Sequence, residues 1–198
     1  MPRYEFDKIR PRDLTPIVAF YIEETYNKWF GLTAEQKKIL IRESYSSAFI
    51  DKNNNPAFEL KTASLLETLK QRGHISNWVP SEKNSPLDRL KIDFVVVRAG
   101  TEKAIGLQIT SHKGNASERR KKIKNMFGEQ IIAVIYFKTQ HKYDVDEQEI
   151  EKRVLAAIYD EGLLTVDIDR PPKKDTESLF QYHTDSIFTD ERKIIENA

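Results

Sequence analysis

LKIDFVVVRAGTEKAIGLQITS, residues 90 to 111, is the stretch that decides the fold. Leu90 to Val97 is rich in β-branched residues, and Ala104 to Ser111 continues the pattern, so the sequence predicts two strands. The linker Gly100 to Lys103 suits a hairpin turn between them. Because side chains alternate in direction along a strand, this hairpin brings Asp93 opposite Gln108.

The hairpin stands in a longer series of helices and strands. A helix and a short strand precede it, and a basic helix, a continuous apolar strand, another helix and a last strand follow it. Mixed strand and helix order with a buried fourth strand indicates a three-layer α/β or α+β domain. The predicted elements span Ala57 to Arg72, Ile75 to Val79, about Ala116 to Met126, Ile131 to Phe137, Asp146 to Tyr159 and Leu164 to Ile168.

The N-terminal part of the chain has helical character. Asp13 or Thr15 suits a helix cap, and Pro16 suits the first turn of that helix. Thr33 and Gln36 form a capping-box pattern, which predicts that a second helix opens there. The expected apolar face of the first helix consists of Ile17, Phe20, Tyr21, Tyr26 and Phe30.

A segment of turn-forming residues, Asp51 to Pro56, divides the chain. We therefore expect an N-terminal helical extension at residues 1–55, an α/β core at residues 56–170 and a charged C-terminal tail at residues 171–198. The tail begins at the Pro171-Pro172 pair.

Composition narrows the class of protein. The 198 residues are 39% hydrophobic and 10% aromatic, which is enough for a packed core. There is no cysteine, so disulfides, thiolate metal sites and a cysteine nucleophile are excluded. The N-terminus is too charged for a secretory signal, and no apolar run is long enough to span a bilayer. We expect a cytoplasmic protein with no membrane partner.

Three polar residues are candidates for a metal site. Glu59 lies near the start of the helix that precedes the hairpin, so packing of that helix on the sheet can bring it near Asp93 and Gln108. Two carboxylates and an amide oxygen suit a hard divalent cation such as Mg²⁺ or Mn²⁺. The backbone carbonyl of Ile109 would add a further oxygen ligand. Such an ion would serve phosphodiester hydrolysis.

These residues, in this order, resemble the PD-(D/E)XK nuclease superfamily, which includes restriction endonucleases and archaeal Holliday junction resolvases. The resemblance covers roughly Pro56 to Phe137. It implies a restriction endonuclease-like three-layer core, with a mixed central sheet flanked by helices. It also implies catalytic and metal-binding roles for Glu59, Asp93 and Gln108. The motifs that carry it are Phe58-Glu59 with Leu65-Leu66 and Gly73, then Ile92-Asp93-Phe94, then Gly106 to Lys113.

The chain departs from the family pattern at Thr110, where a lysine is expected to orient the attacking water or stabilise charge. A displaced lysine is one substitute. Lys91 shares a face with Asp93 by strand parity, and Lys113 follows the end of the strand. His112 is a candidate general base. The sequence leaves the choice open, and Lys113 is the lysine that we include among the catalytic candidates.

A cluster of cations follows the second hairpin strand. Such clusters commonly neutralise phosphates, and the resemblance implies that this helix lies near the nucleic acid. We expect nucleic acid, specifically DNA, as the partner, and the resemblance adds a homodimer. The expected nucleic-acid-binding residues are Lys113, Arg119, Arg120, Lys121, Lys122 and Lys124.

Each candidate also has a purely structural explanation. Asp93 would be a strand-end carboxylate bound to backbone, Glu59 a favourable acid in a helix's first turn, and Gln108 a satisfied buried amide. The basic helix would be a solvated face. Three functions therefore compete. The first is a metal-dependent DNA endonuclease of restriction, repair or mobile-element type, and the second is an inactive nuclease fold that binds nucleic acid or protein. The third is a structural or regulatory protein with no nucleic-acid role, built around its N-terminal helices.

Overall fold

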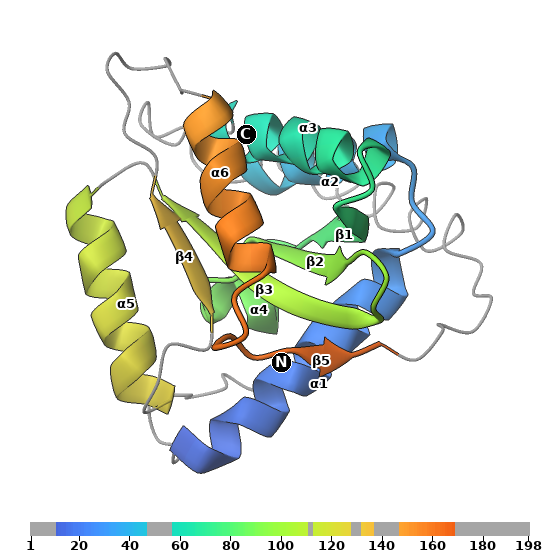
Figure 1. Cartoon of the computed structure of the whole chain (residues 1–198). Coiled ribbons are helices and arrows are strands. Elements are labelled where there is room, and N and C mark those ends of the chain that lie inside the picture. Colours follow the sequence, from blue (N-terminus) through green and yellow to red (C-terminus); the bar gives the residue numbers. More distant parts are fainter. Residues whose placement is uncertain (1–10, 47–56, 111–112, 128–131, 137–146, 169–198) are drawn as a thin grey trace, which may run out of the picture.

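A five-stranded mixed sheet lies between two groups of helices in the computed structural model of the chain (Figure 1). The structure describes residues 11–46, 57–110, 113–127, 132–136 and 147–168. The fold class predicted from the sequence is confirmed at this level: the protein is an α/β protein with a mixed sheet flanked by helices.

The sheet is built around the predicted hairpin. β1 (Ile75–Pro80), β2 (Phe94–Arg98) and β3 (Lys103–Thr110) pair antiparallel in that order. β4 (Ala133–Tyr136) pairs parallel with β3, and the short β5 (Val166–Asp167) pairs antiparallel with the start of β3. β3 is therefore central, with a partner strand on each side.

Helices cover both faces of the sheet. α1 (Pro11–Trp29) and α5 (Lys113–Phe127) pack on one face, while α3 (Ala57–Gln71) and α6 (Glu147–Ile158) pack on the other, with α2 (Ala34–Ser46) beside α3 (Figure 1). This arrangement explains why the middle strands are apolar on both sides.

β2 shows the alternation directly. Val95 and Val97 belong to the hydrophobic cluster on the face of α1 and α5. Phe94 and Val96 belong to the cluster on the face of α3 and α6. The strand is therefore buried on both faces, a position that suits its run of β-branched residues.

The first helix differs from its prediction in two ways. It begins at Pro11, so Asp13, Thr15 and Pro16 lie inside the helix and none of them begins it. The expected apolar face is also wrong at Phe20, whose side chain is 58% exposed. The buried stripe is Val18, Ile22, Tyr26 and Trp29, with the spacing of one helix face.

The capping box that opens the second helix is confirmed. The Thr33 N–H donates to Gln36 Oε1 over 2.9 Å, and the Gln36 N–H donates to Thr33 Oγ1 over 3.3 Å. Gly73 ends α3 as predicted, with φ of +76°. Its N–H donates to the Lys70 carbonyl while the His74 N–H donates to that of Leu69, the two bonds of a Schellman motif.

The first hairpin strand begins later than predicted. Lys91 has φ of +63°, a left-handed conformation that interrupts an extended strand. A short helix, α4 (Pro86–Arg89), precedes it, and the hydroxyl of Ser85 caps that helix by accepting the Asp88 N–H over 3.2 Å. Lys91 therefore does not share a strand face with Asp93, because the chain between them is not a strand.

The N-terminal helices share the core of the sheet. Val18 and Ile22 of α1 pack in one hydrophobic cluster with Val95 and Val97 of β2. The predicted boundary, Asp51 to Pro56, and the predicted tail at residues 171–198 lie outside the described residues. Within the described part, α1 is thus one of the layers that cover the sheet.

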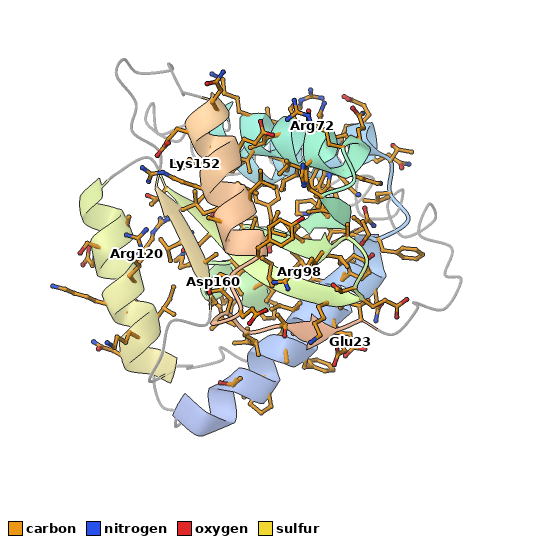
Figure 2. The ribbon with its side chains drawn as sticks, viewed as in Figure 1. Glu23, Arg72, Arg98, Arg120, Lys152 and Asp160 are labelled. Carbon is orange, nitrogen blue, oxygen red and sulfur yellow. The ribbon has the colours of Figure 1, made fainter. Side chains whose placement is uncertain are left out.

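Two arginines connect α6 to the rest of the fold. Arg98, at the end of β2, donates its Nε to the Ile158 carbonyl at the C-terminal end of α6 over 2.7 Å (Figure 2). Arg72, at the end of α3, forms an ion pair with Glu151 of α6. These contacts hold α6 beside α3 on the same face of the sheet.

Candidate metal site and basic helix

Asp93 and Gln108 meet at the end of the β2–β3 hairpin. The register pairs Phe94 with Leu107, which brings Asp93 opposite Gln108 one step further along. Gln108 Nε2 donates to Asp93 Oδ2 over 3.0 Å. The adjacency predicted from hairpin parity is therefore confirmed.

The Asp93 carboxylate also accepts a backbone hydrogen bond. The Ile109 N–H donates to the same oxygen, Oδ2, over 2.6 Å. The Asp93 main chain is held as well, because its N–H donates to the Leu107 carbonyl and its carbonyl accepts the Ser81 N–H. Backbone contacts thus fix the position of the residue. Both hydrogen bonds to its side chain are accepted by Oδ2, and neither involves Oδ1.

Electrostatics bring two more side chains into the site. Burial raises the pKa of Asp93 to about 7, against the lowering effect of the Ile109 N–H. Glu59 raises this pKa further by like-charge repulsion, while the Gln108 amide and the Arg119 guanidinium lower it. Glu59 lies in the first turn of α3, and its Oε2 atom is buried. The charges of both Glu59 and Arg119 therefore act on the pKa of the Asp93 carboxyl.

Gln108 has a buried side-chain amide whose nitrogen forms a hydrogen bond and whose oxygen has none among the described residues. The residue is 1% exposed, and Oε1 has no hydrogen-bond partner among the described residues. Nε2 is the atom that donates to Asp93, which leaves Oε1 as the acceptor atom of the amide. Buried polar atoms are nearly always partnered in folded proteins, and among the described residues this oxygen still has the capacity to accept a further bond.

The donor set fits a hard divalent cation. Asp93, Glu59 and Gln108 Oε1 are all oxygen donors, the type that Mg²⁺ and Mn²⁺ prefer. Within the described ranges, no group of three or more His, Cys, Asp or Glu residues could hold a metal ion. The candidate site has two residues of these four types, Asp93 and Glu59, and its third oxygen ligand would come from the amide of Gln108.

The predicted catalytic lysine is not placed by the structure. Lys113 is the first residue of α5, but its side chain, like all of His112, lies outside what the structure describes. Lys91 is exposed and left-handed. Thr110 is buried at 7% exposure. Among the described cations, the one that acts on Asp93 is Arg119.

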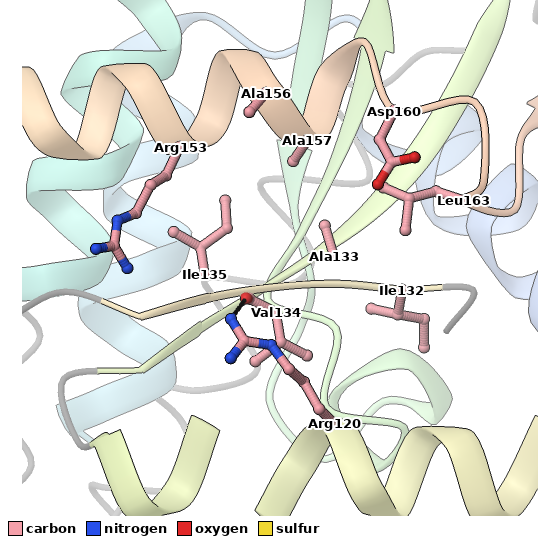
Figure 3. A pocket seen from close by; sticks show the side chains of 10 residues that line it. All are labelled: Arg120, Ile132, Ala133, Val134, Ile135, Arg153, Ala156, Ala157, Asp160 and Leu163. Atoms are coloured by element: carbon pink, nitrogen blue, oxygen red, sulfur yellow. Dashed lines mark hydrogen bonds between the residues drawn. The ribbon is translucent and has the colours of Figure 1, made fainter. Parts of the chain in front are cut away.

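The basic helix divides into two sets of cations. Arg119 Nη1 donates to the Ile109 carbonyl of β3 over 2.9 Å, and Arg120 Nη2 donates to the Val134 carbonyl of β4 over 2.8 Å (Figure 3). Both arginines thus anchor α5 to the sheet. The second set consists of predicted nucleic-acid-binding lysines that are exposed to solvent: Lys121, Lys122 and Lys124.

The position of Arg119 is the feature that sequence reasoning missed. Ala116 and Ile123, three residues before it and four after it, are buried against the sheet. Residues at these spacings share one face of a helix. The signal was therefore present, but the run of consecutive cations concealed it.

A cavity of about 330 Å³ lies between α5, β4 and α6 (Figure 3). Arg120 and Arg153 project into it from opposite helices, and β4 forms the wall between them. Neither Asp93 nor Gln108 lines this cavity. It is thus separate from the candidate metal site.

Comparisons of the chain with known proteins give no match that would indicate a function. No protein-family model matches the chain, and neither the curated proteins nor the solved structures give a significant match. Over the described residues, no helix has both the length and the apolar character needed to cross a membrane.

Proposed function

We propose that this protein is a divalent-metal-dependent phosphodiesterase. More specifically, we propose an endonuclease of the PD-(D/E)XK type that hydrolyses DNA. Two features support this: a mixed sheet between helices, as in a restriction endonuclease-like core, and the convergence of Glu59, Asp93 and Gln108.

The observation that carries the proposal is the buried oxygen of Gln108. Oε1 has no described donor, while Nε2 is held by Asp93 Oδ2 at 3.0 Å. The amide is therefore oriented with its oxygen directed away from the carboxylate it binds. An oriented oxygen beside two acids is the arrangement a hard cation requires.

Hydrolysis adds the oxygen of a water molecule to phosphorus and breaks one phosphorus–oxygen ester bond. Of the two protons of that water, one ends on the leaving alkoxide and the other is released to the solvent. A bound divalent cation would lower the pKa of a coordinated water and offset phosphate charge. Asp93, Glu59 and Gln108 would hold it, and the Ile109 N–H and Gln108 Nε2 keep the Asp93 carboxylate in place.

The exposed lysines of α5 supply a surface for the phosphate backbone. Lys121, Lys122 and Lys124 lie on the same helix as Arg119, which reaches the Asp93 site. DNA bound along this helix would pass close to that site. Lysine contacts to phosphates release counterions, so binding would weaken as salt rises.

DNA cleavage tests the proposal. Purified protein is incubated with supercoiled plasmid in Mg²⁺, in Mn²⁺ and in EDTA, and with duplex RNA in parallel. We expect nicked or linear DNA only with metal, and a loss of at least about 100-fold in Asp93→Asn. Asp160→Asn, an exposed carboxylate after α6, is the matched control. Equal cleavage by Asp93→Asn would show that the site is wrongly assigned.

One observation favours the second candidate, an inactive nuclease fold that binds nucleic acid. The Ile109 carbonyl, expected as a further metal ligand, accepts a hydrogen bond from Arg119. This candidate predicts no cleavage with any divalent metal, but salt-dependent DNA binding that weakens when Lys121, Lys122 and Lys124 are neutralised. Metal-dependent turnover in the plasmid assay would exclude it.

A further inference from the structure

The charge balance of the Asp93 site needs a cation from the protein. Asp93 and Glu59 are both acidic, and they repel each other strongly enough to affect the Asp93 pKa. A phosphodiester brings further negative charge, which grows on its oxygens as the water attacks. Thr110, at the end of β3, has no charge to offset it.

Arg119 is the described cation that reaches this site. Its Nη1 is bound to the Ile109 carbonyl at 2.9 Å, and the Ile109 N–H is bound to Asp93 Oδ2 at 2.6 Å. One residue of β3 therefore links the guanidinium to the carboxylate. Gln108, whose Oε1 has no described partner, precedes that residue directly in the chain.

The chemistry of arginine limits what Arg119 can do there. A guanidinium has five N–H donors, of which the Ile109 bond uses one, so others remain for phosphate oxygens. It stays protonated in proteins, so it cannot remove a proton from water. Its role would be to bind and stabilise negative charge.

We propose that Arg119 supplies, from helix α5, the positive charge that Thr110 does not supply from strand β3, and that it binds the phosphate undergoing hydrolysis. This inference rests on the proposed nuclease function. It assigns Arg119 to the reacting phosphate, whereas Lys121, Lys122 and Lys124 bind flanking phosphates.

The alternative is that Arg119 only anchors α5 to the sheet, and variants at Arg119 and Arg120 separate the two roles. Arg119→Gln removes the charge and, because glutamine is shorter, also the bond to the Ile109 carbonyl, while Arg119→Lys keeps the charge. Arg120→Gln is the matched control, because Arg120 makes the same kind of bond to the Val134 carbonyl.

Two measurements are made on each variant: the single-turnover rate of duplex DNA cleavage in Mg²⁺, and the affinity for Mn²⁺ without DNA. For Arg119→Gln we expect a rate about 100-fold to 1,000-fold lower, the typical effect of losing a charge-stabilising donor. Its Mn²⁺ affinity should be unchanged or higher, since a neighbouring positive charge has been removed. Arg119→Lys should stay within about tenfold of the original rate.

A purely structural role would give a different result. If Arg119→Gln cleaves as fast as Arg120→Gln, or if it loses Mn²⁺ affinity together with rate and lysine does not restore them, the inference is overturned. It is also overturned if Lys113→Gln loses the rate and Arg119→Gln keeps it. If the unaltered protein neither cleaves DNA nor binds Mn²⁺ better than Asp93→Asn does, the proposed function fails and the inference fails with it.

Discussion

Asp93 and Arg119 both form hydrogen bonds with the main chain of Ile109, Asp93 with its N–H and Arg119 with its carbonyl. The Asp93 carboxylate accepts the Ile109 N–H over 2.6 Å, and the Arg119 guanidinium donates to the Ile109 carbonyl over 2.9 Å. β3 is thereby fixed where Gln108 and Thr110 flank Ile109. An acid from the start of β2 and a cation from α5 are thus brought to one position on the central strand.

Gln108→Glu should increase the dependence of stability on metal. A third carboxylate would replace the amide that now donates to Asp93 Oδ2 at 3.0 Å, so without metal it would face Asp93 with no hydrogen bond between them. We expect a lower melting temperature in EDTA and a larger increase on adding Mg²⁺ than the unaltered protein shows. Thermal unfolding with and without Mg²⁺ measures both. A variant that is as stable in EDTA and gains no more from Mg²⁺ would contradict this role of Gln108.

Lys37 should make the protein more stable as pH rises above 7. Its ammonium is fully buried, donates to Asn77 Oδ1 over 2.9 Å and lies 4.8 Å from the centre of the Trp78 ring. Burial, with repulsion from Lys70, lowers the pKa of Lys37 from 10.5 to about 7, and Glu67 opposes the change.

The sign follows from proton uptake. Between pH 7 and the unfolded value of 10.5, unfolding takes up a proton at Lys37, so the free energy of unfolding rises with pH. The slope from one such proton is at most about 1.4 kcal/mol per pH unit. Lys37→Met should lose this rise, and Lys38→Met on the same helix is the control. Denaturant unfolding at pH 7, 8 and 9 measures it; parallel profiles for Lys37→Met and the unaltered protein would refute the prediction.

The exposed lysines of α5 should govern the salt dependence of DNA binding. Combined substitution of Lys121, Lys122 and Lys124 by glutamine should weaken duplex binding and reduce the slope of log K against log salt by about 0.9 for each phosphate that is no longer neutralised. Stability should change little, since all three side chains are exposed. Lys152→Gln, an exposed lysine of α6 (Figure 2), controls for loss of charge elsewhere. An unchanged slope in the triple variant would place the DNA on another surface.

Substitutions on the buried face of α1 should lower the free energy of unfolding more than substitutions on its exposed face. Trp29→Ala removes a side chain with no exposed surface and should destabilise the protein by about 3–5 kcal/mol. Phe20→Ala, on the exposed side of the same helix, should cost less than about 1 kcal/mol. Urea unfolding compares the two, and an equal loss in both variants would contradict the burial pattern of α1.

The sequence predicted what depends on local pattern. The β-branched run and the Gly100 turn predicted the hairpin, and strand parity then predicted the meeting of Asp93 and Gln108. The capping box at Thr33 and Gln36 was predictable because it is made by residues three apart. The left-handed backbone of Lys91, which delays β2, has no comparable signal in side-chain type.

Tertiary contacts were harder to predict. Phe20 was assigned to the apolar face for its size, but the spacing of Val18 and Ile22 decides which side of α1 meets the sheet. Arg119 was grouped with its basic neighbours as a nucleic-acid contact. Its hydrogen bond to Ile109 depends on how α5 packs against β3, which charge alone does not reveal.

The most direct test of the metal site is a crystal structure of the protein soaked in Mn²⁺. We predict an anomalous density peak within about 2–2.5 Å of Gln108 Oε1 and of a carboxylate oxygen of Asp93, with Glu59 beside it. The absence of that peak at a Mn²⁺ concentration that occupies other sites, with Gln108 Oε1 accepting a hydrogen bond from the protein, would contradict it.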